Sequence, residues 1–396
     1  MALVLGLLSA IGPFAIDMYL PALPAIGASL RADIGAVQAS LTVFFIALGA
    51  GQLIYGPLSD MLGRKLPLYA GLALFAIASV GCALATDVDT LVAWRFVEGL
   101  GAAAGMAIPR AVVRDLHTGT DAARLMSLLM LIFSVSPILA PLAGSLAIAL
   151  AGWRSVFWIV AVCAIAGMVM MATSLPETRA RADRVSAGWG SALRAYGLLL
   201  RDGHRLGLVF TGGFAIAGFF TYLANSSFVM IDHYGLSPTM YSIAFGVNAA
   251  AFFAASQFNG ALGDRFGLAM VAKAAVTGCG LVMCAMLLYF WAGGDRLSVR
   301  VVLYFLSSGL MGLVIPTTGV LALEAHGEHA GTASALMGTV QMLTGAVLMA
   351  IVGHFADGRP LPMVAGMAGG AVISMLLGWA TLRGSAHHAV ADSRGH

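Results

Sequence analysis

The sequence predicts an all-α integral membrane protein in which twelve transmembrane helices form two pseudo-symmetric halves of six. Hydrophobic residues make up 60% of the 396 residues and charged residues only 10%, whereas an ordinary soluble domain has roughly 25% charged residues. A soluble chain could not cover that much apolar surface. The apolar residues also fall into long runs, and one short motif occurs twice. We therefore expect lipid to be the solvent for most of the chain.

The motif is Gly56-Pro57-Leu58-Ser59-Asp60-Met61-Leu62-Gly63-Arg64-Lys65, and Gly260-Ala261-Leu262-Gly263-Asp264-Arg265-Phe266-Gly267 repeats part of it. Positions 56 and 260, 58 and 262, 60 and 264, and 63 and 267 carry the same residue, always 204 positions apart. Both copies lie where a long apolar segment meets a short charged connector. Two homologous membrane halves joined head to tail explain this pattern, which is typical of secondary transporters.

Twelve apolar segments are long enough for helices that cross the bilayer, which requires about 20 residues. In the first half they cover roughly residues 2–23, 37–57, 66–86, 89–111, 124–149 and 153–174. In the second half they cover roughly residues 206–230, 240–262, 268–292, 298–322, 329–353 and 361–382. The first run is too long for a cleavable signal peptide, and no small-residue cleavage site follows it. An even number of spans in each half makes the repeat parallel.

These spans define four parts of the chain: residues 1–174, 175–205, 206–382 and 383–396. The first and third are the six-helix halves, and the last is a short polar tail on the cytoplasmic side. The second is a cytoplasmic linker, in which Trp189, Leu193, Tyr196 and Leu200 recur at helical spacing. This spacing favours a short helix at the inner membrane surface, and a linker that only tethers the halves is the alternative.

The distribution of Lys and Arg sets the orientation, because these residues concentrate in cytoplasmic loops. With both termini and Gly63 in the cytoplasm, fifteen basic residues fall inside. Five fall in the outer loops: Arg31, Arg154, Arg296, Arg300 and Arg359. We therefore expect both termini in the cytoplasm.

Three ionisable residues within the spans are candidates for proton coupling, because charge inside a membrane is costly and usually functional. Asp17 lies about 21 Å along the first span from its inner end, and Arg95 lies about 9 Å from the outer end of the fourth. Both therefore lie in the outer half of a core about 30 Å thick. Glu98 follows Arg95 by three residues, on the same helix face. An Asp17–Arg95–Glu98 cluster could switch between charged states, and a static buried ion pair is the alternative.

The repeated motifs are candidates for a conformational latch at the cytoplasmic ends of the second and eighth spans. Glycine permits close helix approach, aspartate suits a helix N-terminus, and Arg64 can reach an acid at the end of the fourth span. Ordinary loop charge is the alternative. The latch candidates are Gly56, Asp60, Gly63, Arg64, Asp115 and Asp264.

Pro137, Pro141 and Gly144 predict a kink and a close helix contact in the fifth span, as a gate would need. Polar and aromatic residues elsewhere could line a substrate cavity or join helices. The cavity candidates are Tyr19, Asn225, Phe228 and Asn248.

Several other classes of function lack support in the sequence. The four cysteines lie in apolar segments without metal-binding spacing, and His326 and His329 have no third ligand nearby. No nucleotide-binding loop, nucleophile elbow or pair of catalytic carboxylates is present. We expect no enzyme activity, cofactor, metal or nucleic-acid partner.

The motifs resemble those of the major facilitator superfamily, and more closely the drug:proton antiporters of the Bcr/CflA type. The resemblance extends over nearly the whole chain. It rests on the loop motif from Gly56 to Lys65 and on Arg95–Ala103 in the fourth span. It also rests on Ala140–Gly144 in the fifth span and on Asp17–Pro24, Leu175–Thr178 and Gly331–Leu336. Glu98 departs from the glutamine usual in the family, and Ser9 stands where some relatives have a second acid.

The resemblance implies export of amphipathic drugs, such as phenicols or bicyclomycin-like compounds, from the bacterial cytoplasm in exchange for protons. Small-molecule drugs, protons and the lipid bilayer would be the partners of a monomer in the bacterial inner membrane. The proton gradient would drive alternating access. A proton-coupled nutrient or metabolite symporter on the same fold is the alternative.

Overall fold

The computed structural model describes residues 2–116, 119–179, 196–197, 200–323 and 330–382, and within these ranges the regular structure is helical. Twelve helices are long and apolar enough to cross a membrane. The predicted fold class is therefore confirmed, and the chain is a multi-pass membrane protein. Most of the predicted linker helix, including Trp189 and Leu193, and the histidines at 326 and 329 lie outside the described residues.

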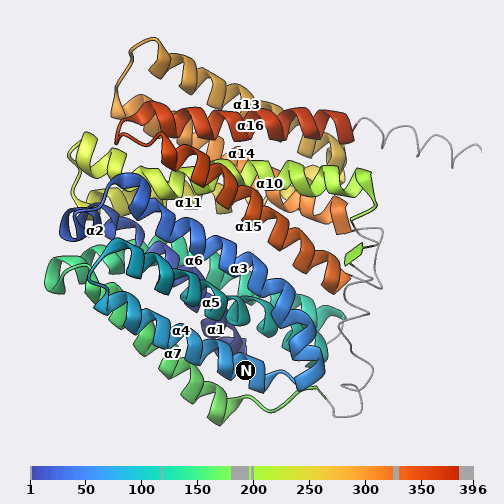
Figure 1. Cartoon of the computed structure of the whole chain (residues 1–396). Coiled ribbons are helices and arrows are strands. Elements are labelled where there is room, and N and C mark those ends of the chain that lie inside the picture. The colour runs from blue at the N-terminus through green and yellow to red at the C-terminus, as the bar shows by residue number, and fades with distance from the viewer. Residues whose placement is uncertain (1, 117–118, 180–195, 198–199, 324–329, 383–396) are drawn as a thin grey trace, which may run out of the picture. The chain divides into compact units, whose positions relative to one another are not determined.

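The first six spans begin and end within five residues of prediction, except that the first continues to Leu30 and not to residue 23. Figure 1 shows their helices in blue to green. They are α1 with α2 (Ala2–Asp17 and Leu23–Leu30), α3 (Ile34–Leu62), α4 (Lys65–Leu84), α5 (Val88–Leu116), α6 (Gly119–Ala151) and α7 (Arg154–Ser174).

The first span is broken, whereas the sequence predicted one continuous helix over residues 2–23. α1 ends at Asp17, a 3-10 turn covers Leu20–Ala22, and α2 begins at Leu23. Pro21 and Pro24 account for the break, because each lacks an amide donor and each stands in the first turn of a new helical segment, where that loss costs least. As a result, Asp17 lies at a helix end inside the membrane.

The second six spans are drawn in yellow-green to red in Figure 1. They are α10 with a π-helical turn (Gly203–Ser227 and Phe228–His233), α11 with α12 (Pro238–Ser256 and Asn259–Phe266), α13 (Leu268–Trp291), α14 (Leu297–Leu323), α15 (Ala330–His354) and α16 (Pro360–Thr381). Arg300, assigned from the sequence to an outer loop, lies within α14 and is buried.

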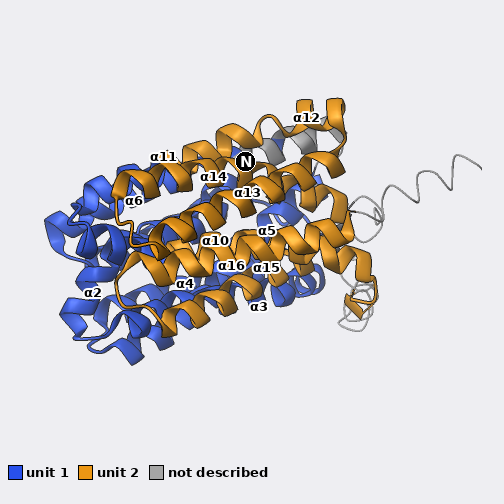
Figure 2. Ribbon diagram, turned by 90° about the horizontal axis from the view of Figure 1, so that it is seen from above, with its two compact units in different colours: residues 1–195, 224–246 blue, residues 196–223, 247–396 orange. Residues whose placement is uncertain are grey.

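The chain divides into two compact units, which Figure 2 shows in blue and orange. The first contains residues 1–195 and also 224–246, and the second contains residues 196–223 and 247–396. The unit boundary thus falls inside α10 and again inside α11. In the first unit α5 packs on α3 and α4, and α1 packs on α5, α6 and α7. In the second unit α13 packs on α14 and α16.

Candidate functional site

Three buried charged residues of the first unit lie at the break in the first span and in the first turns of α5. Asp17 is 6% exposed, and Arg95 and Glu98 are fully buried. Among the described residues, Asp17 and Glu98 are the buried acids. All three sequence-predicted coupling residues therefore lie in the protein interior.

Arg95 and Glu98 form a direct ion pair, with 2.7 Å between Nη1 and Oε2. The Glu98 carboxylate also accepts a hydrogen bond from Ser79, at 2.8 Å, and a weak one from the Cys82 thiol, at 3.7 Å. The negative charge of Glu98 is thus compensated by a cation and by further donors.

The Arg95 guanidinium lies between aromatic rings. Its Cζ atom is 4.2 Å from the ring centre of Phe44 and 4.5 Å from that of Tyr19. Nε and Nη2 of Arg95 are buried and make no hydrogen bond within the described part of the chain. Cation–π attraction therefore stabilises this charge in the interior. Tyr19 was a cavity candidate, but it is fully buried, and its hydroxyl is hydrogen-bonded to that of Ser40 at 2.7 Å.

Asp17 makes a different contact from the one the cluster hypothesis required. Oδ2 of Asp17 accepts a hydrogen bond from the Ser136 hydroxyl on α6 at 3.2 Å. No ion pair joins Asp17 to Arg95 among the described contacts. Arg95 and Glu98 are therefore paired with each other, whereas Asp17 is hydrogen-bonded to the fifth span. Sequence analysis missed Ser136, which precedes Pro137 but belongs to no recognised motif.

The fifth span meets the break in the first span at a second point. Gly144 of α6 packs so closely on the backbone of Met18 that an added Cβ atom would collide with the Met18 carbonyl oxygen. Pro137 and Pro141 lie inside α6, where each removes a hydrogen bond of the helix. The Pro141 carbonyl also accepts a hydrogen bond from the Ser242 hydroxyl at 2.9 Å.

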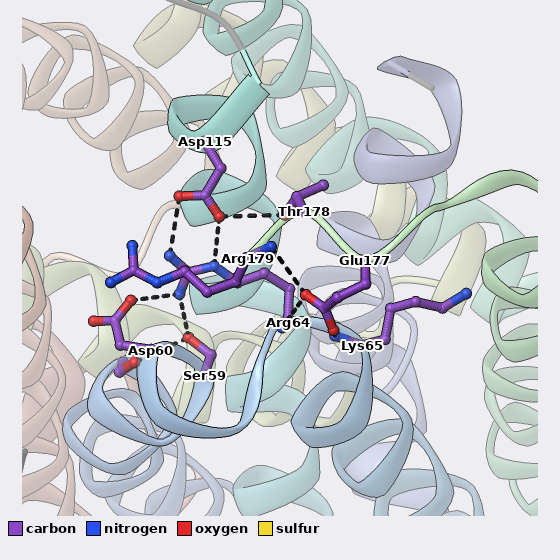
Figure 3. Close-up of polar contacts among 9 residues, drawn as sticks. Ser59, Asp60, Arg64, Lys65, Asp115, Glu177, Thr178 and Arg179 are labelled. Carbon is purple, nitrogen blue, oxygen red and sulfur yellow. Dashed lines mark hydrogen bonds and ion pairs between the residues drawn. The ribbon is translucent and has the colours of Figure 1, made fainter. Parts of the chain in front are cut away.

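Arg64 lies at the centre of a polar network at the Gly56–Lys65 motif, drawn in Figure 3. Its Nε and Nη2 atoms bind the two carboxylate oxygens of Asp115 at 2.7 and 3.1 Å. Its Nη1 atom binds Ser59 and Asp60, both at 2.7 Å. Burial by itself would lower the pKa of Arg64, but hydrogen bonding to Asp115 and the charges of Asp60 and Asp115 outweigh it and raise the pKa. Arg64 therefore stays charged.

Glu177, just after the sixth span, completes this network. Its carboxylate accepts hydrogen bonds from the backbone amides of Arg64 and Lys65 at 2.8 and 3.2 Å, at the N-terminus of α4. The neighbouring Thr178 hydroxyl donates to Asp115 at 3.2 Å. A carboxylate at a helix N-terminus satisfies free amides and opposes the positive end of the helix dipole. Two residues of the Leu175–Thr178 motif thus contact Arg64 and Asp115 directly (Figure 3).

The two copies of the repeated motif differ in their contacts. Gly63 and Gly267 both have positive φ, of 91° and 81°, so a glycine is needed at each. Gly56 has open space around it, so close packing does not explain that glycine. Asp264 is exposed, and no hydrogen bond or ion pair joins it to another residue in the described ranges. The sequence explains the difference: 204 positions after Arg64 and Asp115 stand Leu268 and Gly319.

The remaining cavity candidates are mostly buried and make side-chain contacts. Asn225 accepts a hydrogen bond from Gln38 at 2.9 Å, and Asn248 donates one to Tyr222 at 3.3 Å. Phe228 is 3% exposed and is the first residue of the π-helical turn. No group of three possible metal ligands occurs in the described part of the chain.

A second buried arginine in an aromatic setting lies in the second unit. Arg300 follows Arg95 by 205 positions, is 2% exposed, and lies 5.8 Å from the ring centre of Tyr222. Tyr222 in turn stacks on Tyr304 with 4.0 Å between ring centres. Where Glu98 follows Arg95 by three residues, Leu303 follows Arg300. Arg300 is thus one position off the 204-residue register of the repeat, and it has no acidic neighbour at the corresponding spacing.

Comparison with known proteins places these features in a family. The family model described as Major Facilitator Superfamily matches residues 5–349. An uncharacterized MFS-type transporter, YdgK, of Bacillus subtilis (strain 168) is 37% identical over 378 residues, which cover 95% of this chain and 94% of that protein. These matches agree with the prediction of a transporter rather than an enzyme.

Two further relatives have names that refer to resistance. A bicyclomycin resistance protein homolog of Haemophilus influenzae is 28% identical over 380 residues, which cover 94% of each chain. Multidrug resistance protein D of Escherichia coli (strain K12) is 31% identical over 353 residues, which cover 88% of this chain and 87% of that protein. Among solved structures, a D-xylose-proton symporter superimposes with a TM-score of 0.75 over 96% of each chain, at 15% identity. At that identity the likeness concerns the fold alone.

Proposed function

Since the chain belongs to the Major Facilitator Superfamily, a family of membrane transporters, we propose that it exports amphipathic drugs from the bacterial cytoplasm in exchange for protons. The resistance names of two relatives that match most of the chain support a drug as the substrate. The observation that carries the proton coupling is the environment of Asp17.

Asp17 is the buried acid that lacks a cationic partner among its described contacts. Glu98 already has the charge of Arg95 beside it, whereas Asp17 receives one hydrogen bond from a neutral hydroxyl. An unpaired buried charge is costly, and binding a proton removes that cost. We therefore assign proton binding to Asp17 and electrostatic support to the Arg95–Glu98 pair.

In the proposed cycle the protein alternates between two global states. Asp17 takes a proton from the outside, and its protonated form favours the state that returns inward. Release of that proton to the cytoplasm favours drug binding and the outward step. One proton moving down 100 mV provides about 2.3 kcal/mol, and one pH unit adds about 1.4 kcal/mol. For a neutral drug, this free energy supports a gradient of a few hundred-fold.

The Arg64 network would stabilise one of these states, as a latch does. Four charged or polar side chains from α3, α5 and the segment after α7 converge on Arg64 or on its backbone amide, so a change in the angle between these elements would break several bonds together. The proposed orientation places this network and both termini in the cytoplasm of a monomer in the inner membrane. Pro137, Pro141 and Gly144 would act as a gate in the fifth span, beside the proton site.

Inverted membrane vesicles with an acidic interior and a pH-quenched dye test the proposal. Phenicols, cationic dyes and sugars are added to wild type, to Asp17→Asn and to the control Asp89→Asn, an exposed aspartate at the outer end of α5. We expect drugs to cause dequenching in wild type and in the control but not in Asp17→Asn. Dequenching that survives Asp17→Asn would move the coupling role to Glu98. A lack of response to every drug, together with sugar-driven alkalinisation of the medium by intact cells, would favour the symporter instead.

A further inference from the structure

The hydroxyl of Ser136 is placed to act on the proton-binding carboxyl. Ser136 is fully buried, and its hydroxyl donates to Oδ2 of Asp17 across the interface of α6 and α1. This bond is the direct polar link that the structure records for the Asp17 carboxyl. Any change in the charge of Asp17 therefore acts first on Ser136.

A serine inside a membrane helix usually donates its hydroxyl to a carbonyl of its own helix. Two other serines of α6 follow this rule: Ser134 donates to Leu131 at 2.7 Å, and Ser145 donates to Leu142 at 2.9 Å. Ser136 departs from it, because its recorded bond reaches another helix. Packing alone does not require a hydroxyl at this position, whereas a nearby carboxylate needs a donor.

Ser136 also directly precedes the first of the two prolines inside α6. Pro137 follows it directly, and the carbonyl of Pro141, five residues beyond Ser136, accepts the hydrogen bond from Ser242 of α11. Gly246 of the same α11 segment packs against the Ile138 backbone of α6. One short stretch of α6 thus contacts the proton site at one end and α11 at the other.

We infer that Ser136 is a positioning residue that stabilises the deprotonated form of Asp17 and transmits its protonation state to the fifth span. This inference rests on the proposed function and assigns that function a further residue. A charged Asp17 can only accept, so it holds the Ser136 hydroxyl and with it this stretch of α6. A protonated Asp17 gains a donor and keeps only a neutral acceptor oxygen, so the bond that it accepts from Ser136 weakens or reverses.

Other charges near Asp17 are few, so the effect of the hydroxyl can be measured. Among the helices packed on α1, α5 has Arg95 and Glu98, which are paired with each other, and its other charged residues stand in its first turn or its last two turns. α6 has no charged residue between 134 and 151, and α7 has Arg154 at its outer end. Tyr19, two residues after Asp17, is hydrogen-bonded to Ser40.

Infrared difference spectra of the purified protein, recorded as a function of pH, test the inference without a drug. The carbonyl band of a protonated carboxyl is assigned to Asp17 by its loss in Asp17→Asn. Because a hydrogen bond to a charged group is lost in Ser136→Ala, we expect the midpoint of this band to move to higher pH by on the order of one unit, a tenfold change in proton affinity. Ser136→Thr retains a hydroxyl and should restore most of the shift. Ser145→Ala removes a buried hydroxyl of the same helix and should leave the midpoint unchanged.

A second measurement links the hydroxyl to transport. In the vesicle assay, Ser136→Ala should move the pH dependence of drug-driven dequenching in the same direction as the infrared midpoint. Adding Ser136→Ala to Asp17→Asn should change nothing further, because the serine acts through the carboxyl. An unchanged infrared midpoint in Ser136→Ala, or the absence of a titrating Asp17 band in wild type, would overturn the inference. Absence of drug-driven dequenching in wild type together with a shifted infrared midpoint would overturn the drug assignment and leave the role of Ser136 standing.

Discussion

At the scale of single residues, the ion pairs that involve a buried arginine lie, among the described residues, in the first unit. Arg95 is balanced by Glu98 and held by aromatic rings, and Arg64 is balanced by Asp60 and Asp115. Each arginine is buried, so each needs its partners more than a surface arginine would. Changes at the partners should therefore have large and distinguishable effects.

Replacing Glu98 tests the buried pair. Glu98→Ala leaves the Arg95 charge uncompensated in the interior, and we expect the free energy of unfolding to fall by about 3–5 kcal/mol. Glu98→Gln should cost less, because the amide oxygen can still accept the bond from Arg95, and the amide NH2 group can donate to the Ser79 hydroxyl. Unfolding of the purified protein in mixed micelles measures both. Equal stability of Glu98→Ala and wild type would show that Arg95 finds another partner.

Replacing Arg64 tests the latch. Lysine keeps the charge but cannot bind the two oxygens of Asp115 side by side. Arg64→Lys should therefore slow transport severalfold while leaving drug affinity nearly unchanged, since the network lies away from the proton site. Transport rates in vesicles and equilibrium drug binding separate these effects. Asp264→Asn, at the second copy of the motif, is the matched control and should transport at the wild-type rate.

At the scale of elements, the break in the first span lies against the proline-containing fifth span. Prolines end α1 at Asp17, and α6 contacts that end through Ser136 and through Gly144. Helix ends inside a membrane leave backbone groups that neighbouring helices must cover. The close approach of α1 and α6 at this point therefore matters for folding and, in the proposed cycle, for gating.

Gly144→Ala tests this close approach. Its new methyl group would meet the Met18 backbone, which cannot rotate away as a side chain can. We expect a loss of about 1–3 kcal/mol in the free energy of unfolding and a strong loss of transport. Gly369→Ala on α16 is the control, because no atom lies within 4 Å of its added Cβ. If the two variants unfolded at the same denaturant concentration, the contact would carry no energetic weight.

At the scale of the whole molecule, the internal repeat and the compact units do not coincide. The repeat divides the chain near its middle, but residues 224–246, from the seventh and eighth spans, belong to the first compact unit. Within that unit Asn225 is bound to Gln38 and Ser242 to Pro141. An alternating carrier must exchange contacts of this kind during its cycle.

A reversible cross-link tests this exchange. Cysteines at positions 38 and 225, in a chain without its native cysteines, are joined by a short reducible reagent. Transport should stop on cross-linking and return on reduction, because the bond between these side chains, 2.9 Å long, would have to open. As a control, a pair at positions 277 and 379 joins α13 and α16 inside the second unit, where Trp379 donates to Thr277 at 2.8 Å. Full transport by the cross-linked 38–225 pair would show that residue 225 stays with the first unit throughout the cycle.

The sequence by itself determined the twelve spans, the repeat and the residues that carry charge into the membrane. Apolar runs of about 20 residues and motif spacing depend only on local order along the chain, and Arg64 with Asp115 could be paired because both lie at the same end of neighbouring spans. The tertiary structure decided which buried groups meet. Asp17 contacts Ser136, which is 119 positions away in the sequence, and Glu177 caps α4 although it is at least 112 positions from the amides that it binds. Arg300 is buried and does not lie in a loop. These contacts depend on how helices rotate and where prolines break them, which hydropathy does not encode.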